Sequence, residues 1–339
     1  MIIQVEQLQK NYITYERGAS FRETVASLFK RKPIEIQAVK GLSFEMEAGE
    51  IVGFLGPNGA GKSTTLKILT GVLYPTAGNV QVLGYTPWKH RKKYVRNIGA
   101  VFGQKSQLLW DIPPIDAFYM NKAIYALEDE PFQETLDQLV DLLDVGEVMR
   151  KPTRQLSLGE RMKCEFIMAM LHRPKVVFLD EPTIGLDVIA KEKIRSFIQE
   201  MNERGVTFIL TTHDLEDVEK LAKRVIVVNH GEIVFDDSIG ALRNFLGAKK
   251  TVTLTTEVQA DWSGISGVSV LKQVSEVEAE LELDTEQLEL KEFIRMVNDR
   301  YTIHDMSINA LPIDRVIKEL YQVDTKTLPN TKTLSPLNK

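Results

Sequence analysis

One segment, which joins an apolar run to a glycine-rich turn and a helical pattern, constrains the fold more than any other part of the chain. The run EIVGFLG (50–56) has the length and composition of a buried strand. Gly56, Gly61, Lys62 and Ser63 then occupy every fixed position of the pattern G-x-x-x-x-G-K-S/T. A strand that passes through such a loop into a helix is typical of α/β proteins that bind nucleotide phosphates.

The chemistry of this loop explains its residue types. Glycines let backbone N–H groups turn inward and cradle phosphate oxygens. We expect Lys62 to reach the β- and γ-phosphates and the hydroxyl of Ser63 to ligate Mg²⁺. The residues expected to hold the phosphates are Gly56, Pro57, Asn58, Gly59, Ala60, Gly61, Lys62, Ser63 and Thr64.

A second apolar run, VVFLDE (176–181), ends in two acidic residues. Asp180 closes the strand, so its carboxylate is expected at the sheet edge beside the loop, where it can hold Mg²⁺ directly or through water. Glu181 is then positioned to polarise the water that attacks the γ-phosphate. Two acids at a strand end are common, and only their pairing with the phosphate loop favours this interpretation over a simple strand terminus.

The fold class predicted for residues 1–240 is α/β, with helices around a mainly parallel sheet, because strand-like and helix-like segments alternate there. GVTFILTTHD (205–214) is a further strand candidate, and KRVIVVNHGEIVFDD (223–237) is expected to form a terminal strand pair. Residues 248–322 instead alternate apolar and polar residues and then turn helical, which predicts a small α+β domain. The Thr-, Pro-, Asn- and Lys-rich tail, 325–339, is expected to be disordered.

Length and charge narrow the class of protein. A chain of 339 residues is long enough for two domains. Its net charge of −5 disfavours bulk nucleic acid as a partner. The single cysteine, Cys164, fits a reducing compartment. We expect no secretory signal and no membrane-spanning run, so that any spanning of a bilayer would fall to another chain.

The segment GASFRETVASLFKRKP (18–33) interrupts the first β-region. Ser20 and Glu23 have capping-box spacing, and an apolar face follows them, so an amphipathic helix is expected near residues 20–30. The helix could pack on its own domain, or it could touch a membrane surface or a membrane partner.

The stretch QLSLGERMKCE (155–165) lies just before the second acidic strand. The ATP-binding cassette (ABC) family carries its Leu-Ser-Gly-Gly-Gln signature at this place, and most of residues 1–238 resemble that family. Further ABC motifs match in family order. Tyr12 resembles the aromatic that stacks on adenine, Gln104 the Q-loop glutamine, Asp187 in GLD the D-loop, and His213 the switch histidine.

The resemblance implies an ABC ATPase fold, with a helical subdomain at about 105–172 that carries the signature. It also implies a homodimer of cassettes that encloses two Mg²⁺-ATP. The expected catalytic residues are Glu181, His213 and Gln104, and the expected metal ligands are Ser63, Gln104 and Asp180. The other copy's Ser157 and Gly159 would contact ATP, and Tyr12 and Asp187 complete the expected nucleotide contacts.

Two residues depart from the family signature. Leu158 replaces a glycine and need only turn its side chain away from the phosphate. Glu160 replaces a glutamine, and a carboxylate beside the γ-phosphate would repel it. We therefore expect Glu160 to point outward, toward Arg161 or another basic residue.

The signature region and the insertion before AVKGLSF most resemble the ATP-binding subunits of ABC-2 type exporters, in the daunorubicin- and viologen-exporter-like branch. That resemblance implies separate transmembrane permease chains and a peripheral location on the cytoplasmic face of the cell membrane. The permease is expected to dock near Gln107–Phe118, where Leu108, Leu109 and Trp110 are either exposed contacts or core residues.

Other function classes stay open. A soluble ABC protein acting on ribosomes or DNA is the main alternative, although ribosome-acting members usually carry two cassettes and repair proteins carry coiled-coil arms. A GTPase is disfavoured because NKAI (121–124) lacks the aspartate of the guanine-reading motif. Residues 248–322 could bind a regulatory ligand or only stabilise the dimer.

Overall fold

The computed structural model describes residues 1–15, 33–103, 106–212, 214–245, 249–311 and 313–322. The chain divides into two compact units, Met1–Asp236 and Asp237–Lys339, here called the N-terminal and C-terminal units. The sequence placed this boundary at residue 240. The helix expected near residues 20–30 and the tail 325–339 lie outside the described residues.

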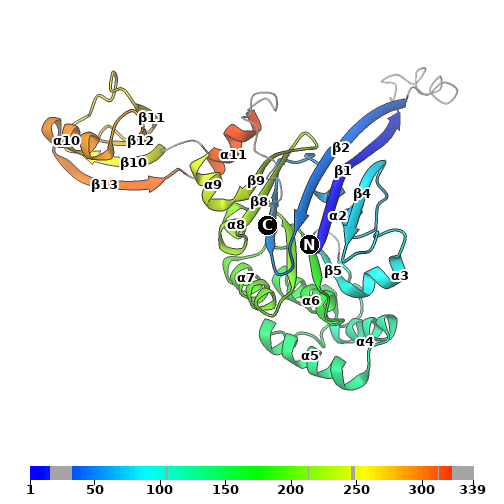
Figure 1. Ribbon diagram of the computed structural model, residues 1–339. Coiled ribbons are helices and arrows are strands. Elements are labelled where there is room, and N and C mark those ends of the chain that lie inside the picture. The colour runs from blue at the N-terminus through cyan, green and yellow to red at the C-terminus, as the bar shows by residue number, and fades with distance from the viewer. Residues whose placement is uncertain (16–32, 104–105, 213, 246–248, 312, 323–339) are drawn as a thin grey trace, which may run out of the picture. The chain divides into compact units, whose positions relative to one another are not determined.

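A six-stranded sheet forms the centre of the N-terminal unit (Figure 1). In spatial order its strands are β5 (Ile98–Phe102), β6 (Val176–Asp180), β7 (Thr207–Thr211), β3 (Ile51–Leu55), β8 (Arg224–Asn229) and β9 (Glu232–Ser238). The pairs from β5 through β8 are parallel. Every residue of β3 and β7 is buried, as parallel strands covered on both faces require.

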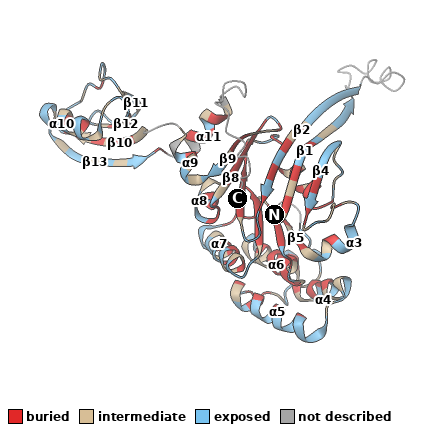
Figure 2. Ribbon diagram, viewed as in Figure 1, coloured by how far each residue is buried: buried red, intermediate tan, exposed pale blue. Residues whose placement is uncertain are grey.

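A smaller antiparallel sheet lies in the same unit, with β1 (Ile3–Tyr15) between β2 (Pro33–Met46) and β4 (Ala77–Val82). The strand ends near Ile3 and Met46 are buried, whereas the ends near Tyr15 and Pro33 are exposed (Figure 2). This sheet therefore contributes only part of its length to the core.

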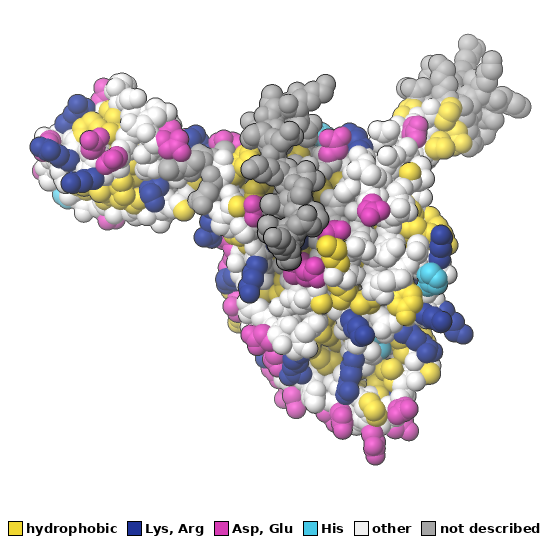
Figure 3. All heavy atoms as spheres, in the orientation of Figure 1, with side chains coloured by type: hydrophobic (Ala, Val, Ile, Leu, Met, Phe, Trp, Pro, Cys, Tyr) yellow, Lys and Arg dark blue, Asp and Glu magenta, His cyan; other side chains and the backbone are white. Residues whose placement is uncertain are grey.

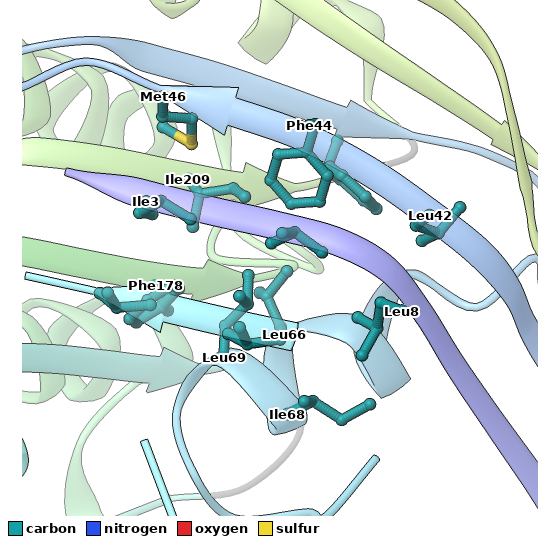
Figure 4. Close-up of a cluster of buried hydrophobic side chains, with 14 of the residues drawn as sticks. Ile3, Leu8, Leu42, Phe44, Met46, Leu66, Ile68, Leu69, Phe178 and Ile209 are labelled. Carbon is teal, nitrogen blue, oxygen red and sulfur yellow. The ribbon is translucent and has the colours of Figure 1, made fainter. Parts of the chain in front are cut away.

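The core of the N-terminal unit joins the two sheets through helix α2 (Lys62–Leu69). Leu66, Ile68 and Leu69 of α2 pack in one cluster with Phe44 of β2 and Phe178 of β6 (Figure 4). All of these side chains are almost completely buried. The helix that follows the phosphate loop is thus anchored on both sheets.

The remaining helices of the unit include a layer of three, α4 (Pro114–Tyr125), α5 (Asp129–Leu143) and α6 (Leu158–Met170). On α5 the buried residues Phe132, Leu136, Leu139, Val140 and Leu143 follow helical spacing and form its packed face. The other helical segments are α3 (Arg91–Tyr94), η1 (Val95–Asn97), η2 (Thr153–Gln155), α7 (Val188–Glu203) and α8 (Leu215–Leu221).

The C-terminal unit is built on a four-stranded antiparallel sheet of order β11-β12-β10-β13. Its elements are α9 (Ile239–Asn244), β10 (Lys249–Thr256), β11 (Val268–Gln273), β12 (Glu278–Asp284), α10 (Leu290–Arg300), β13 (Ile303–Ala310) and α11 (Ile313–Gln322). A separate apolar cluster around Trp262, Leu281 and Phe293 fills this unit. Strand β11 was not predicted, although Val268, Val270 and Leu271 give it apolar residues, and none of its residues is buried.

Acidic and basic side chains are interspersed over the face of the molecule shown in Figure 3. None of the described helices has the length and apolar character needed to cross a bilayer.

Candidate nucleotide-binding site

The glycine-rich loop connects β3 to α2, as the sequence predicts. Gly61 has a φ of 105°, and a Cβ there would lie 2.5 Å from the carbonyl oxygen of Ala38. At Gly56 a Cβ would overlap the carbonyl oxygen of Val228. Both positions therefore require glycine for steric reasons, and the loop is held close to the backbones of β2 and β8.

Lys62 lies in the first turn of α2 and folds its side chain over the loop. Its Nζ donates to the carbonyl oxygens of Gly56 at 2.6 Å and Pro57 at 3.1 Å. Burial lowers the pKa of the Lys62 ammonium, and the nearby carboxylates of Glu181 and Asp180 oppose that shift. The net result is a cation held beside two anions at the mouth of the loop.

Ser63 and Asp180 come together although they are far apart in the sequence. The Ser63 Oγ donates to Asp180 Oδ1 at 2.9 Å, and Thr211 Oγ1 donates to the same oxygen at 2.6 Å. A hydroxyl and a carboxylate are hard oxygen ligands of the kind that Mg²⁺ prefers. This pair therefore fits the predicted magnesium site, shared with a nucleotide.

One cavity of about 350 Å³ contains most of the predicted phosphate site. It is lined by Ala38, Asn58, Gly59, Ala60, Gly61, Lys62, Ser63, Thr64, Lys67, Phe102, Asp180 and Glu181. Glu181 has a φ of 57°, a left-handed conformation that is uncommon for a glutamate. Its backbone N–H donates to Thr211 O at 3.0 Å, which fixes the residue at the end of β6.

The signature stretch begins helix α6 with a complete capping box. Ser157 Oγ accepts from the N–H of Glu160 at 3.2 Å, and Glu160 Oε2 accepts from the N–H of Ser157 at 2.8 Å. The carboxylate of Glu160 folds back onto the start of its own helix, and Lys151 and Lys163 are basic residues close enough to contribute to the lowering of its pKa. That hydrogen bond from the Ser157 backbone is the main reason why the pKa of Glu160 is lowered.

Comparison with known proteins places the chain in a family. The model of the ABC transporter family matches residues 39–184. An uncharacterized ABC transporter ATP-binding protein of Methanocaldococcus jannaschii is 34% identical over 196 residues, which cover 57% of this chain and 69% of that protein. The chain belongs to the ATP-binding proteins of ABC transporters. The predicted family and the assignment to its ATPases are thereby confirmed.

Two further matches extend this result. The linearmycin resistance ATP-binding protein of Bacillus subtilis is 27% identical over 293 residues, 86% of this chain and 93% of that protein. A dimeric structure of a bacterial ABC transporter cassette covers 70% of this chain and 98% of its own, with a TM-score of 0.58 and 23% identity. The predicted ABC ATPase fold is confirmed.

Several expected contacts of this ABC ATP-binding protein lie outside the phosphate cavity. Tyr12 is 39% exposed on β1, where Lys10 Nζ stands 5.3 Å from the centre of its ring. Asp187 caps α7 by accepting from the N–H of Ala190 at 2.8 Å. Ser157 and Gly159 also lie away from the cavity lining. Gln104 and His213 are outside the described residues.

Packing also explains why a residue as small as Gly159 stands in the signature. A Cβ on Gly159 would stand 2.9 Å from Cβ of Ala190, so α6 and α7 approach each other closely there. Leu158 is 36% exposed, and its Cδ2 lies 3.1 Å from where Gly185 would carry a Cβ. Gly185 thus leaves room for the leucine that replaces the family's glycine.

The sequence did not single out Thr211, Lys67, Ala38 or Phe102 as site residues. Thr211 is paired with Asp180 in the register of β6 and β7, so its position at a strand end was the available signal. Lys67 lies one turn after Ser63 on α2, on the side that helical spacing predicts. Ala38 and Phe102 carry no chemical signal, and only the fold brings them to the cavity.

Proposed function

We propose that this chain is the ATP-hydrolysing subunit of an ABC-2 type exporter that drives separate transmembrane permease chains. The observation that carries the proposal is the single cavity that holds Lys62, Ser63, Asp180 and Glu181 together. The resistance function named for the Bacillus subtilis relative supports export over import. The cargo would be selected by the permease, and not by this chain.

Hydrolysis would use the residues of the cavity in distinct roles. Backbone N–H groups of Asn58–Thr64 and the Lys62 ammonium would bind the phosphates. Ser63 and Asp180 would hold Mg²⁺, which neutralises phosphate charge when it is bound. Glu181 would accept the proton of the attacking water. Gln104 and His213 are proposed to orient that water and contact the γ-phosphate, and Tyr12 to stack on adenine.

The active form is proposed to be a head-to-tail homodimer. The N-terminus of α6 carries the positive end of a helix dipole, which favours an anion, and the capping box uses the N–H of Glu160 in its first turn. Because Ser157 and Gly159 lie outside the chain's own phosphate cavity, they are free to serve the nucleotide of a second copy. Asp187, at the start of α7, is proposed to contact the same interface.

The contact with the permease is proposed at Gln107–Phe118. Leu108 is buried, at 5% exposure, so the alternative that it belongs to the core is correct for this residue. Leu109 and Trp110 are 51% and 57% exposed, so that alternative is wrong for them. Neighbouring apolar side chains this exposed are typical of a surface that another protein covers. The chain would then lie peripherally on the cytoplasmic face of the membrane.

The test is affinity purification from native membranes solubilised in mild detergent, with mass spectrometry of the copurifying chains. Stoichiometric recovery of one or two polytopic permeases would support the exporter. Recovery only from the soluble fraction with ribosomes or nucleic acid attached would replace it with the alternative, a soluble ABC ATPase that acts on those partners.

A further inference from the structure

Glu165 is an acidic side chain buried outside the phosphate cavity. It lies on α6 and is 4% exposed. Its Oε1 accepts from the hydroxyl of Ser106, and its carboxylate oxygens lie 2.9 and 3.1 Å from the backbone nitrogen of Gln107. The backbone nitrogen of Leu108 is 3.4 Å from Oε1. Burial raises the pKa of Glu165 despite these hydrogen bonds, so the position is costly for a carboxylate.

The same segment, Ser106–Ile112, is fastened a second time to residues that precede α6. The Arg154 N–H donates to Trp110 O at 3.0 Å, and the Arg154 guanidinium pairs with Asp111 at 2.6 Å. The hydroxyl of Thr153 donates to Ile112 O at 2.8 Å. The segment is therefore bonded to residues that lie on both sides of Ser157 in the sequence: Thr153 and Arg154 precede it, and Glu165 follows it.

These two attachments connect an exposed surface to the signature. Leu109 and Trp110 lie between them and direct their side chains to solvent. Ser157 lies about 12 Å from Glu165 along the axis of α6, at the 1.5 Å rise of each residue. The backbone beside Leu109 and Trp110 is thus hydrogen-bonded both to Glu165 within α6 and to the residues that precede this helix.

We propose that Glu165 is a positioning residue that fastens Ser106–Ile112 to α6 and so couples the permease contact to the signature end of the helix. An ionised carboxylate suits this role because it offers only acceptor sites, and three donors of consecutive residues face it. A glutamine of the same shape would present an NH₂ group to part of that donor cluster. The proposal rests on the proposed function, because it takes Leu109 and Trp110 as the permease-facing residues.

The test compares Glu165→Gln and Glu165→Ala with wild type in two assays. The first follows hydrogen exchange of the Gln107 and Leu108 amides in the isolated chain. Both variants should speed it by about ten- to a hundredfold, the effect of losing charge-assisted hydrogen bonds. The second measures hydrolysis after reconstitution with the copurified permease. Permease stimulation should fall by about tenfold, while ATP affinity and basal hydrolysis stay within about twofold, since the hydrogen bonds described for Glu165 end on Ser106, Gln107 and Leu108, which do not line the phosphate cavity.

A matched control is Thr135→Val in α5, another buried polar residue of the same helical layer. Its hydroxyl donates to Pro131 O at 2.7 Å and accepts from Arg173 Nε, and it makes none of the contacts to Ser106–Ile112 described above. This variant should lower stability and keep permease stimulation. Equal loss of stimulation in Thr135→Val and Glu165→Gln would reduce the role of Glu165 to general stability and overturn the proposal.

Two other outcomes separate the inference from the function on which it rests. Unchanged amide exchange, or stimulation that survives Glu165→Ala, would overturn the positioning role while leaving the exporter intact. A wild-type chain that no copurified permease stimulates would contradict the exporter itself, whatever the exchange assay shows.

Discussion

At the scale of single residues, Glu181 is the side chain that the proposed chemistry needs most. It lines the same cavity as Lys62 and Ser63, and the hydrogen bond from its N–H to Thr211 O fixes its backbone. Removing a positioned general base typically lowers the rate by about 10²–10⁴-fold. The binding of ATP depends on other residues and is expected to persist.

We therefore expect Glu181→Gln to bind ATP, to lose steady-state hydrolysis and to trap a dimer. Phosphate release measures the loss of hydrolysis, and size-exclusion chromatography with ATP detects the trapped dimer. Hydrolysis near the wild-type rate would show that Glu181 is not the base. Glu192→Gln, on the exposed side of α7, serves as a control acid that should leave both readouts unchanged.

At the scale of elements, the start of α6 depends on the reciprocal bonds of Ser157 and Glu160. Glu160→Ala should destabilise the chain by about 0.5 kcal/mol, a small value because solvent screens this partly exposed carboxylate. The pKa of Glu160 is lowered, so its stabilisation is present above its ordinary value of 4.5 and is lost as the pH falls through the lowered pKa. Denaturant unfolding between acidic and neutral pH should show the gap between wild type and variant closing toward low pH.

Glu160→Gln is the matched control, because glutamine can complete a capping box without titrating. Its stability relative to Glu160→Ala should not change with pH. A gap between wild type and Glu160→Ala that grows as the pH falls would contradict the capping role of the carboxylate.

The second prediction at the scale of elements concerns the segment between β5 and α4. Trp110→Ala should leave the ATPase rate of the isolated chain within about twofold and uncouple transport, because its side chain is exposed and makes little core contact. Vesicle transport and phosphate release are measured together. Leu108→Ala, a buried neighbour, should instead lower stability by about 2–5 kcal/mol. Loss of nucleotide binding in Trp110→Ala would reveal a core defect.

The phosphate loop and the segment that contains Leu108, Leu109 and Trp110 show how much of the site the sequence could predict. Spacing alone identified the strand, loop and helix around Lys62 and the acidic strand end at Asp180, because these patterns follow from local chain geometry. Leu108, Leu109 and Trp110 are equally apolar in the sequence, and only tertiary packing separates the buried one from the exposed two. Ser157 and Glu160 have the spacing of a capping box, but spacing alone does not fix where the carboxylate of Glu160 turns.

At the scale of the whole molecule, the C-terminal unit has a core of its own. Phe293 is fully buried with Trp262 and Leu281. Phe293→Ala should cost about 3–5 kcal/mol within that unit and leave ATP affinity unchanged. Hydrogen exchange of β10 and β12 measures the loss of stability in the C-terminal unit, and nucleotide titration measures the affinity for ATP. A large change in ATP affinity would show that the two units do not behave independently.

The close approach of Gly56 to Val228 and of Gly61 to Ala38 has a consequence for binding. The width of the phosphate loop is set by the spacing of neighbouring strands, and so it is fixed when the sheets form. A nucleotide then meets a preorganised anion receptor and loses little affinity to ordering the backbone. Substitutions in β2 and β8 that make no contact with the ligand should accordingly change the affinity for ATP, because the positions of these two strands set the width of the loop that holds the phosphates.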